Sequence, residues 1–159
     1  MSPANIPANI PANIPANIPA NIPANIPANI NETGSHTNSF GGLSVLLVED
    51  SWHLAQAQTL VLASVGVDVM GPVGTIAEAE ALLAKRVPDV ALVDLNLNGE
   101  MAYSLIDRLL QDDICVIVAT GYEVLPHLEE KVAAILRKPF RASVLLATLH
   151  RIVDERHAP

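Results

Sequence analysis

The chain has 159 residues, of which 50% are hydrophobic but only 3% aromatic, and its formal net charge at pH 7 is −8. Nucleic-acid binding generally needs a basic face, so we expect no nucleic-acid partner. No apolar run approaches the roughly 20 residues that span a bilayer, and we recognise no secretion signal. We therefore expect a cytoplasmic protein with no membrane partner, and the single cysteine, Cys115, fits a reducing compartment.

Residues 1–42 are unlike a folded domain. The tetrapeptide Pro-Ala-Asn-Ile occurs seven times between Pro3 and Ile30, and a polar linker follows. A proline at every fourth position is incompatible with a helix, so our first interpretation of this low-complexity repeat plus linker is disorder. It could instead be an interaction segment, or come partly from cloning, because Gly-Ser-His at 34–36 resembles a cloning scar. We assign the folded domain to residues 43–156.

Apolar runs alternate with helical patterns from Leu43 onward. The runs that we expect to form strands are residues 44–49, 67–74, 88–94, 114–120 and 131–138. The patterns that we expect to form helices are residues 50–66, 75–86, 101–111 and 141–156. Strands that alternate with helices favour a parallel sheet. We predict an α/β fold with a doubly wound, five-stranded parallel sheet in the flavodoxin-like order 2-1-3-4-5, and helices on both faces.

Local signals refine two of these helices and predict a fifth, shorter one. In the first, apolar residues that include Leu54 and Leu60 lie near helical spacing. Thr75, followed by Glu78 three residues later, predicts a capping box at the start of the second. The segment between the fourth and fifth strands is short and contains Pro126, so the helix there should be truncated or irregular.

Polar side chains follow four of the five predicted strands. These strand-end residues are Glu49 and Asp50 for the first strand, Asp94 for the third, Thr120 for the fourth and Lys138 for the fifth. The carboxyl ends of parallel strands meet at one edge of a sheet. Three carboxylates there would need a hard cation such as Mg²⁺, while a lysine and a hydroxyl suit phosphate oxygens. The pattern predicts a site that accepts a phosphoryl group on a carboxylate.

Each of these residues also has a simpler interpretation when it is taken alone. Asp94 could be a turn residue, and Glu49 and Asp50 could cap a helix. Lys138 could be a solvated surface lysine, and Thr120 a residue that favours strands. Their placement at the ends of four strands of one sheet is what favours a functional site.

Four segments resemble the motifs of response-regulator receiver domains. They are VLLVEDS, DVALVDLNL, VIVATGY and LRKPF, in the family's order and near its usual spacing. The similarity covers roughly Leu43 to Arg156. The ATGY sequence and the short DLNLNGE loop resemble a subgroup of stand-alone, single-domain receivers typical of alphaproteobacteria, so the resemblance implies a bacterial protein.

The resemblance assigns roles to the acidic residues. It implies that Asp94 is the phosphoacceptor. It also implies that Glu49, Asp50 and Asp94 hold Mg²⁺, directly or through water, and that the carbonyl of Asn96 completes the metal's ligands.

The resemblance also concerns the switch that follows phosphorylation. It implies that Thr120 is the switch hydroxyl, that Lys138 binds the phosphoryl oxygen, and that the Lys138–Pro139 bond is cis. Receivers commonly carry Tyr or Phe three residues before that lysine, but this chain has Ile135. The usual switch is therefore in doubt, and Tyr122 is a candidate substitute.

The function implied is that of a response regulator in a two-component system. We expect Asp94 to take a phosphoryl group from a histidine kinase or a histidine phosphotransfer protein. No segment after Arg156 is long enough for an output domain, so we expect signalling by protein contact, with an unknown downstream partner and homodimerisation open. We expect no enzyme acting on other substrates, only a module that catalyses its own phosphorylation and dephosphorylation.

Two alternative functions remain. One is a pseudo-receiver that binds partners without phosphorylation, which Ile135 keeps open. The other is a phosphatase of the haloacid dehalogenase kind, whose chemistry needs a second acid two residues after the nucleophile. This chain has Asn96 at that position, which argues against the phosphatase.

Overall fold

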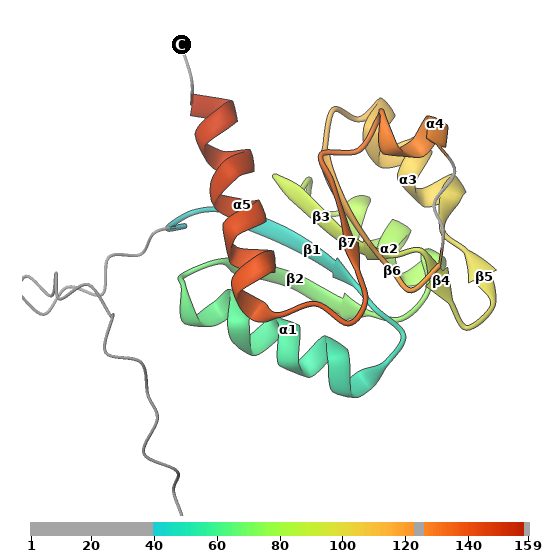
Figure 1. Ribbon diagram of the computed structural model, residues 1–159. Helices are drawn as coiled ribbons and strands as arrows, with labels where there is room; N and C mark the ends of the chain where they lie inside the picture. The colour runs from blue at the N-terminus through green and yellow to red at the C-terminus, as the bar shows by residue number, and fades with distance from the viewer. Residues whose placement is uncertain (1–39, 123–125, 158–159) are drawn as a thin grey trace, which may run out of the picture. The chain divides into compact units, whose positions relative to one another are not determined.

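The computed structural model describes residues 40–122 and 126–157 (Figure 1). Five parallel strands form one sheet in the order β2-β1-β3-β6-β7. They are β1 (Ser44–Val48), β2 (Asp68–Val73), β3 (Val90–Asp94), β6 (Cys115–Thr120) and β7 (Ala134–Arg137). Numbered among themselves these strands have the order 2-1-3-4-5, so the predicted flavodoxin-like topology is confirmed. The Pro-Ala-Asn-Ile repeat lies outside the described residues, and its disorder stays a prediction.

The central strands are apolar between their ends because both faces of the sheet are covered. Every residue of β1 and β3 is buried, whereas β2 at the edge of the sheet is partly exposed. The edge strand contains a cis Gly71–Pro72 bond, at a position where a missing ladder donor is tolerated. A Cβ on Gly71 would lie 2.8 Å from the carbonyl oxygen of Leu47, so only glycine fits between the two strands.

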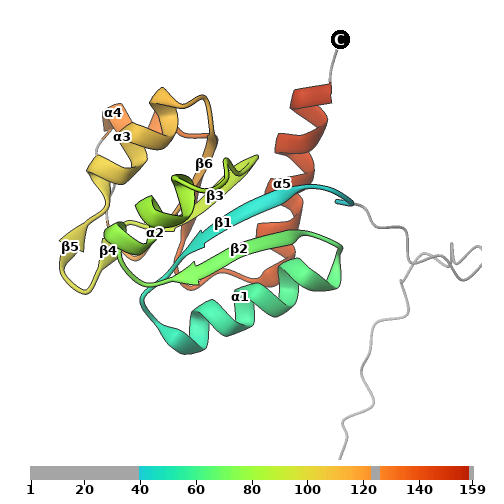
Figure 2. The same ribbon diagram turned by 180° about the vertical axis from the view of Figure 1, so that it is seen from behind.

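Helices cover both faces of the sheet (Figures 1 and 2). On one face lie α1 (Trp52–Ser64) and α5 (Ala142–His157), and on the other α2 (Ile76–Leu83), α3 (Tyr103–Gln111) and α4 (Pro126–Glu129). The predicted cap of α2 is confirmed, since Thr75 Oγ1 accepts a hydrogen bond from the Glu78 N–H at 3.2 Å. The predicted truncation is confirmed too, because α4 has four residues and begins at Pro126.

The inner face of α1 differs from the apolar pattern of its sequence. Leu54 is 45% and Leu60 69% exposed, whereas Ala55, Gln58 and Leu62 are the residues that α1 buries. The spacing therefore predicted the helix correctly but did not indicate which side of it is buried. The helix has apolar residues all around, so periodicity alone does not select a face.

A short antiparallel hairpin, absent from the sequence prediction, follows β3. It consists of β4 (Asn96–Leu97) and β5 (Glu100–Met101). The turn residues Asn98 and Gly99 both have positive φ, 54° and 93°, as a type I′ turn requires. Because Met101 belongs to this hairpin, α3 begins at Tyr103 and not at Met101 as predicted.

The described part of the chain begins with a core residue. Phe40 is buried, and its ring centroid lies 4.3 Å from that of His150 on α5. The packing of the domain therefore includes a residue before Leu43. Within residues 40–122 and 126–157, no helix combines the length and apolarity needed to cross a membrane.

Candidate functional site

Three carboxylates meet at the carboxyl edge of the sheet. β1 and β3 are parallel neighbours, so Glu49 and Asp50, which follow β1, lie beside Asp94, the last residue of β3. One carboxylate oxygen from each residue lies within 4.8 Å of the others. Glu49 and Asp94 are buried and Asp50 is half-buried. The structure thus brings together the three acids that the sequence placed at strand ends.

The ammonium group of Lys138 lies against two of these acids. Its Nζ is 2.6 Å from Oε2 of Glu49 and 2.7 Å from Oδ2 of Asp94. Burial acts to lower the pKa of Lys138, but its hydrogen bonds to Asp94 and Glu49 and their charges raise the pKa above the ordinary value of 10.5. Burial raises the pKa of Glu49, against the opposing effect of Lys138. The lysine is therefore held as a cation at the centre of the site.

The charges of the site favour a divalent cation. Three carboxylates and one ammonium group leave a net negative charge among buried oxygens. Buried charge is costly unless it is paired or coordinates a metal. Carboxylate oxygens from Glu49, Asp50 and Asp94 are the hard ligands that Mg²⁺ prefers. The cluster could hold such an ion.

The β4–β5 hairpin supports the acids through its backbone. The N–H of Asn98 donates to Oδ2 of Asp50 at 2.9 Å, and the N–H of Asn96 donates to Oδ1 of Asp94 at 3.1 Å. The Asn96 side chain in turn accepts from the Gly99 N–H at 2.7 Å. The sequence analysis missed Asn98, although an Asn-Gly pair is a strong hairpin signal. The hairpin orients the carboxylates that the predicted site needs.

Comparison with known proteins identifies the family. The model of the response regulator receiver domain matches residues 45–150. The chain belongs to this family. The resemblance seen in the sequence is thereby confirmed, and it places the chain among domains that act in two-component signalling. None of the curated proteins matches the chain.

Solved receiver structures have the same fold. The receiver domain of the PhyR response regulator from Erythrobacter litoralis is 25% identical, with a TM-score of 0.67 over 75% of this chain and 95% of that one. A CheY-like receiver domain protein from Methanospirillum hungatei is 24% identical, with a TM-score of 0.64 over 71% and 94% of the two chains. The chemotaxis response regulator CheY4 of Vibrio cholerae is 24% identical, with a TM-score of 0.60 over 69% and 98%.

Thr120, which the family resemblance predicts to be the switch residue, is fully buried. Its Oγ1 accepts from the Tyr122 N–H at 2.9 Å, and its carbonyl accepts from the Lys138 N–H at 2.8 Å. Its hydroxyl is thus engaged by the backbone that follows β6, and its main chain is joined to Lys138. The Lys138–Pro139 bond is cis, as the family resemblance implied.

The two candidate switch side chains differ in environment. Tyr122 is 60% exposed, and its carbonyl accepts a hydrogen bond from Nη1 of Arg137 at 2.8 Å. Ile135, at the position where receivers commonly carry an aromatic residue, is partly buried against the core that includes α2, α3 and α4. Within residues 40–122 and 126–157, neither side chain forms a hydrogen bond with the acids, so the role of Tyr122 stays a prediction.

Proposed function

We propose that the chain is a response regulator whose Asp94 accepts a phosphoryl group from a histidine kinase or a histidine phosphotransfer protein in the bacterial cytoplasm. The observation that carries this proposal is the convergence of Glu49, Asp50 and Asp94 with Nζ of Lys138 placed on Asp94. One carboxylate oxygen of Asp94 forms a bond to phosphorus. The bond from phosphorus to the donor's imidazole nitrogen breaks, and that nitrogen keeps the electron pair.

The surrounding residues have separate tasks in this proposal. Mg²⁺, held by Glu49, Asp50, Asp94 and the carbonyl of Asn96, would neutralise the charge of the phosphoryl oxygens. Lys138, already aligned on Asp94, binds one of those oxygens as a point charge. The Thr120 hydroxyl, which donates to the carbonyl of Tyr122 at 3.4 Å, donates instead to a phosphoryl oxygen and so passes the change to the surface. The output is then a protein contact, and no other substrate is turned over.

Intact mass measurement after incubation with Mg²⁺ and acetyl phosphate tests the proposal. We expect one added phosphoryl group on the wild type and none on Asp94→Asn. Asp89→Asn is the matched control, because Asp89 lies just before the other end of the same strand and should leave labelling unchanged. Full labelling of Asp94→Asn would refute the assignment of the phosphoacceptor.

A second function, that of a pseudo-receiver, is favoured by Ile135. The residue packs into the core in place of the aromatic side chain that would report phosphorylation. A pseudo-receiver would acquire no covalent phosphate from acetyl phosphate or from any kinase. Titration with Mg²⁺ separates the two functions further. The fluorescence of Trp52 is the signal, because Trp52 lies two residues after Asp50 and is 68% exposed.

A phosphatase of the haloacid dehalogenase kind has less support. Asn96 occupies the position of the required second acid, and its side chain is engaged as an acceptor for Gly99 N–H. Turnover of a generic phosphate ester would favour that enzyme over both receiver functions.

A further inference from the structure

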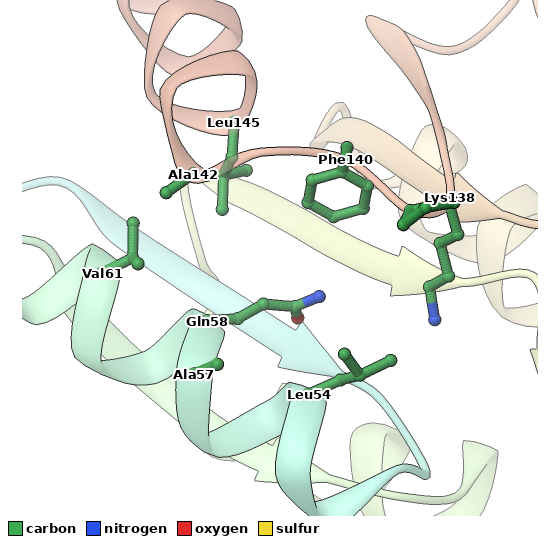
Figure 3. Close-up of a pocket in the computed structure, with 9 residues that line it drawn as sticks. Leu54, Ala57, Gln58, Val61, Lys138, Phe140, Ala142 and Leu145 are labelled. Atoms are coloured by element: carbon green, nitrogen blue, oxygen red, sulfur yellow. The ribbon is translucent and has the colours of Figure 1, made fainter. Parts of the chain in front are cut away.

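A cavity lies beside the acidic site, between α1 and the segment that joins β7 to α5 (Figure 3). Its volume is about 360 Å³, within the range of about 300–1,000 Å³ that is usual for small-molecule sites. Most of its wall is apolar and is formed by Leu54, Ala57, Val61, Phe140, Ala142 and Leu145. The size and lining of the cavity are those of a site for a compact apolar molecule.

Among the described residues that line the cavity, the one cationic group is already paired. Lys138 contributes its side chain to the wall, but its Nζ bonds to Glu49 and Asp94 outside the cavity. In the part of the chain that the structure describes, no other charged side chain lines the cavity. A charged ligand would therefore lose its hydration without gaining a partner, and the expected ligand is neutral.

Gln58 gives the cavity its one specific polar feature. The side chain extends from α1 toward Phe140, into the space between the helix and the loop (Figure 3). Gln58 is only 8% exposed, and among the described residues its Oε1 is the buried side-chain polar atom without a hydrogen-bond partner. Burial of an unpaired acceptor is unfavourable. Such an atom in an apolar wall is explained when a ligand supplies the missing donor.

We propose that this cavity binds a small, neutral, mostly apolar molecule that donates one N–H or O–H hydrogen bond to Oε1 of Gln58. The apolar walls hold the body of the molecule, and the amide oxygen selects the donor. None of the three carboxylates lines the cavity, although Lys138, which bonds to two of them, does. The site is thus additional to the proposed phosphoacceptor function.

Indole and benzofuran form a matched pair of probes, since they have nearly the same shape and only indole carries an N–H. Each is titrated into the full chain, and binding is followed by two-dimensional NMR of the backbone amides. We expect indole to bind with shifts centred on Gln58 and Phe140. We also expect it to bind roughly tenfold more tightly than benzofuran, the difference that one hydrogen bond supplies. Equal affinities, shifts centred elsewhere or no binding of indole would overturn the proposal.

Variants of α1 test the role of the amide. Gln58→Leu should bind indole no more tightly than benzofuran, because the acceptor is absent. Gln56→Leu, the same substitution at an exposed position of the same helix, should keep the tenfold preference for indole. Ala57→Leu places a larger side chain in the cavity and should weaken both probes. Retention of the preference in Gln58→Leu would contradict the assignment of the acceptor.

A last variant separates this proposal from the receiver function. Asp94→Asn should bind indole as the wild type does, even though it cannot be phosphorylated. Amide spectra with the dispersion of the wild type verify that each variant is folded. Loss of indole binding in a folded Asp94→Asn would show that the site belongs to the acidic cluster and would refute an independent cavity.

Discussion

Nζ of Lys138 lies 2.7 Å from Oδ2 of Asp94, and this contact connects the ends of β7 and β3 across β6, which lies between them in the sheet. The same nitrogen lies 2.6 Å from Oε2 of Glu49. One cation therefore compensates two buried carboxylates from different strands. This double role makes the lysine important for stability as well as for phosphoryl binding.

Replacement of Lys138 by Met should destabilise the metal-free protein. The variant keeps the apolar stem but leaves Glu49 and Asp94 without their cation, and breaking a buried pair in this way costs about 3 kcal/mol or more. Mg²⁺ should restore more stability to Lys138→Met than it adds to the wild type, because no ammonium group competes for the carboxylates. Urea unfolding with and without Mg²⁺ measures both effects.

Lys85→Met is the control for this experiment. Lys85 is exposed and takes part in no ion pair among the described residues. Its replacement should change the unfolding free energy by less than about 0.5 kcal/mol, with the same Mg²⁺ response as the wild type. A Lys138→Met protein as stable as the wild type without Mg²⁺ would mean that the carboxylates do not depend on the lysine.

The hairpin after β3 gives a second prediction. Gly99 has a φ of 93°, and no atom lies within 4 Å of the position that a Cβ would occupy, so Gly99→Ala adds backbone strain without a steric clash. That strain costs about 1 kcal/mol. If the hairpin shifts to relieve it, the Asn98 N–H no longer orients Asp50, and Mg²⁺ affinity should fall by up to about fivefold. A Mg²⁺ titration of Trp52 fluorescence measures the change.

Gly42→Ala is the matched control for Gly99→Ala. Gly42 has a φ of 89° and equally open surroundings, but it precedes β1, at the opposite edge of the sheet from the acids. It should lose comparable stability and keep the Mg²⁺ affinity of the wild type. Equal loss of affinity in both variants would show that the hairpin has no specific effect on Asp50.

Much of the fold and the location of the site could be predicted from the sequence, for one physical reason. Buried strands are apolar, so a charged residue such as Asp94 at a strand end is conspicuous, and parallel topology then brings such ends together. The contact of the Asn98 N–H with Asp50 could not be predicted, because it depends on how the hairpin folds back in space. The buried side of α1 was also hidden, because it includes Gln58 while Leu54 and Leu60 are exposed.

Gln58 gives a third prediction, which concerns stability without any ligand. Its buried Oε1 has no hydrogen-bond partner, and an unsatisfied acceptor costs about 1–3 kcal/mol. Gln58→Leu should therefore raise the free energy of unfolding by about 1 kcal/mol. This value is the lower end of the range, because the leucine side chain leaves part of the cavity empty. Chemical denaturation beside Gln56→Leu, which should differ from the wild type by less than about 0.5 kcal/mol, checks this. A destabilised Gln58→Leu would mean that the amide is satisfied in solution.

Asp89 and Ser44 connect the starts of β3 and β1 at the edge of the sheet opposite the acids. Oδ2 of Asp89 accepts from both the N–H and the Oγ of Ser44, each at 2.8 Å, and Nη1 of Arg156 lies 3.8 Å from Oδ1. Partial burial acts to raise the pKa of Asp89. The hydrogen bonds from Ser44 and the charges of Arg156 and Arg86 outweigh it and lower the pKa below the ordinary value of 3.8.

A depressed carboxyl pKa predicts a stability contribution that depends on pH. Because the folded protein holds the proton of Asp89 less tightly than the unfolded chain, the contribution is complete above the unfolded pKa and is lost as pH falls through the lower folded pKa. At pH 7 Asp89→Asn should lower the unfolding free energy by about 1 kcal/mol, a modest value for a hydrogen-bonded charge that is partly exposed. The difference in unfolding free energy from the wild type should shrink as the pH falls below 3.8.

Urea unfolding of both proteins across this pH range measures the difference, with Asp107→Asn as an exposed control on α3. A difference that stays constant down to the lowest pH would mean that the ionised carboxylate contributes nothing at this contact.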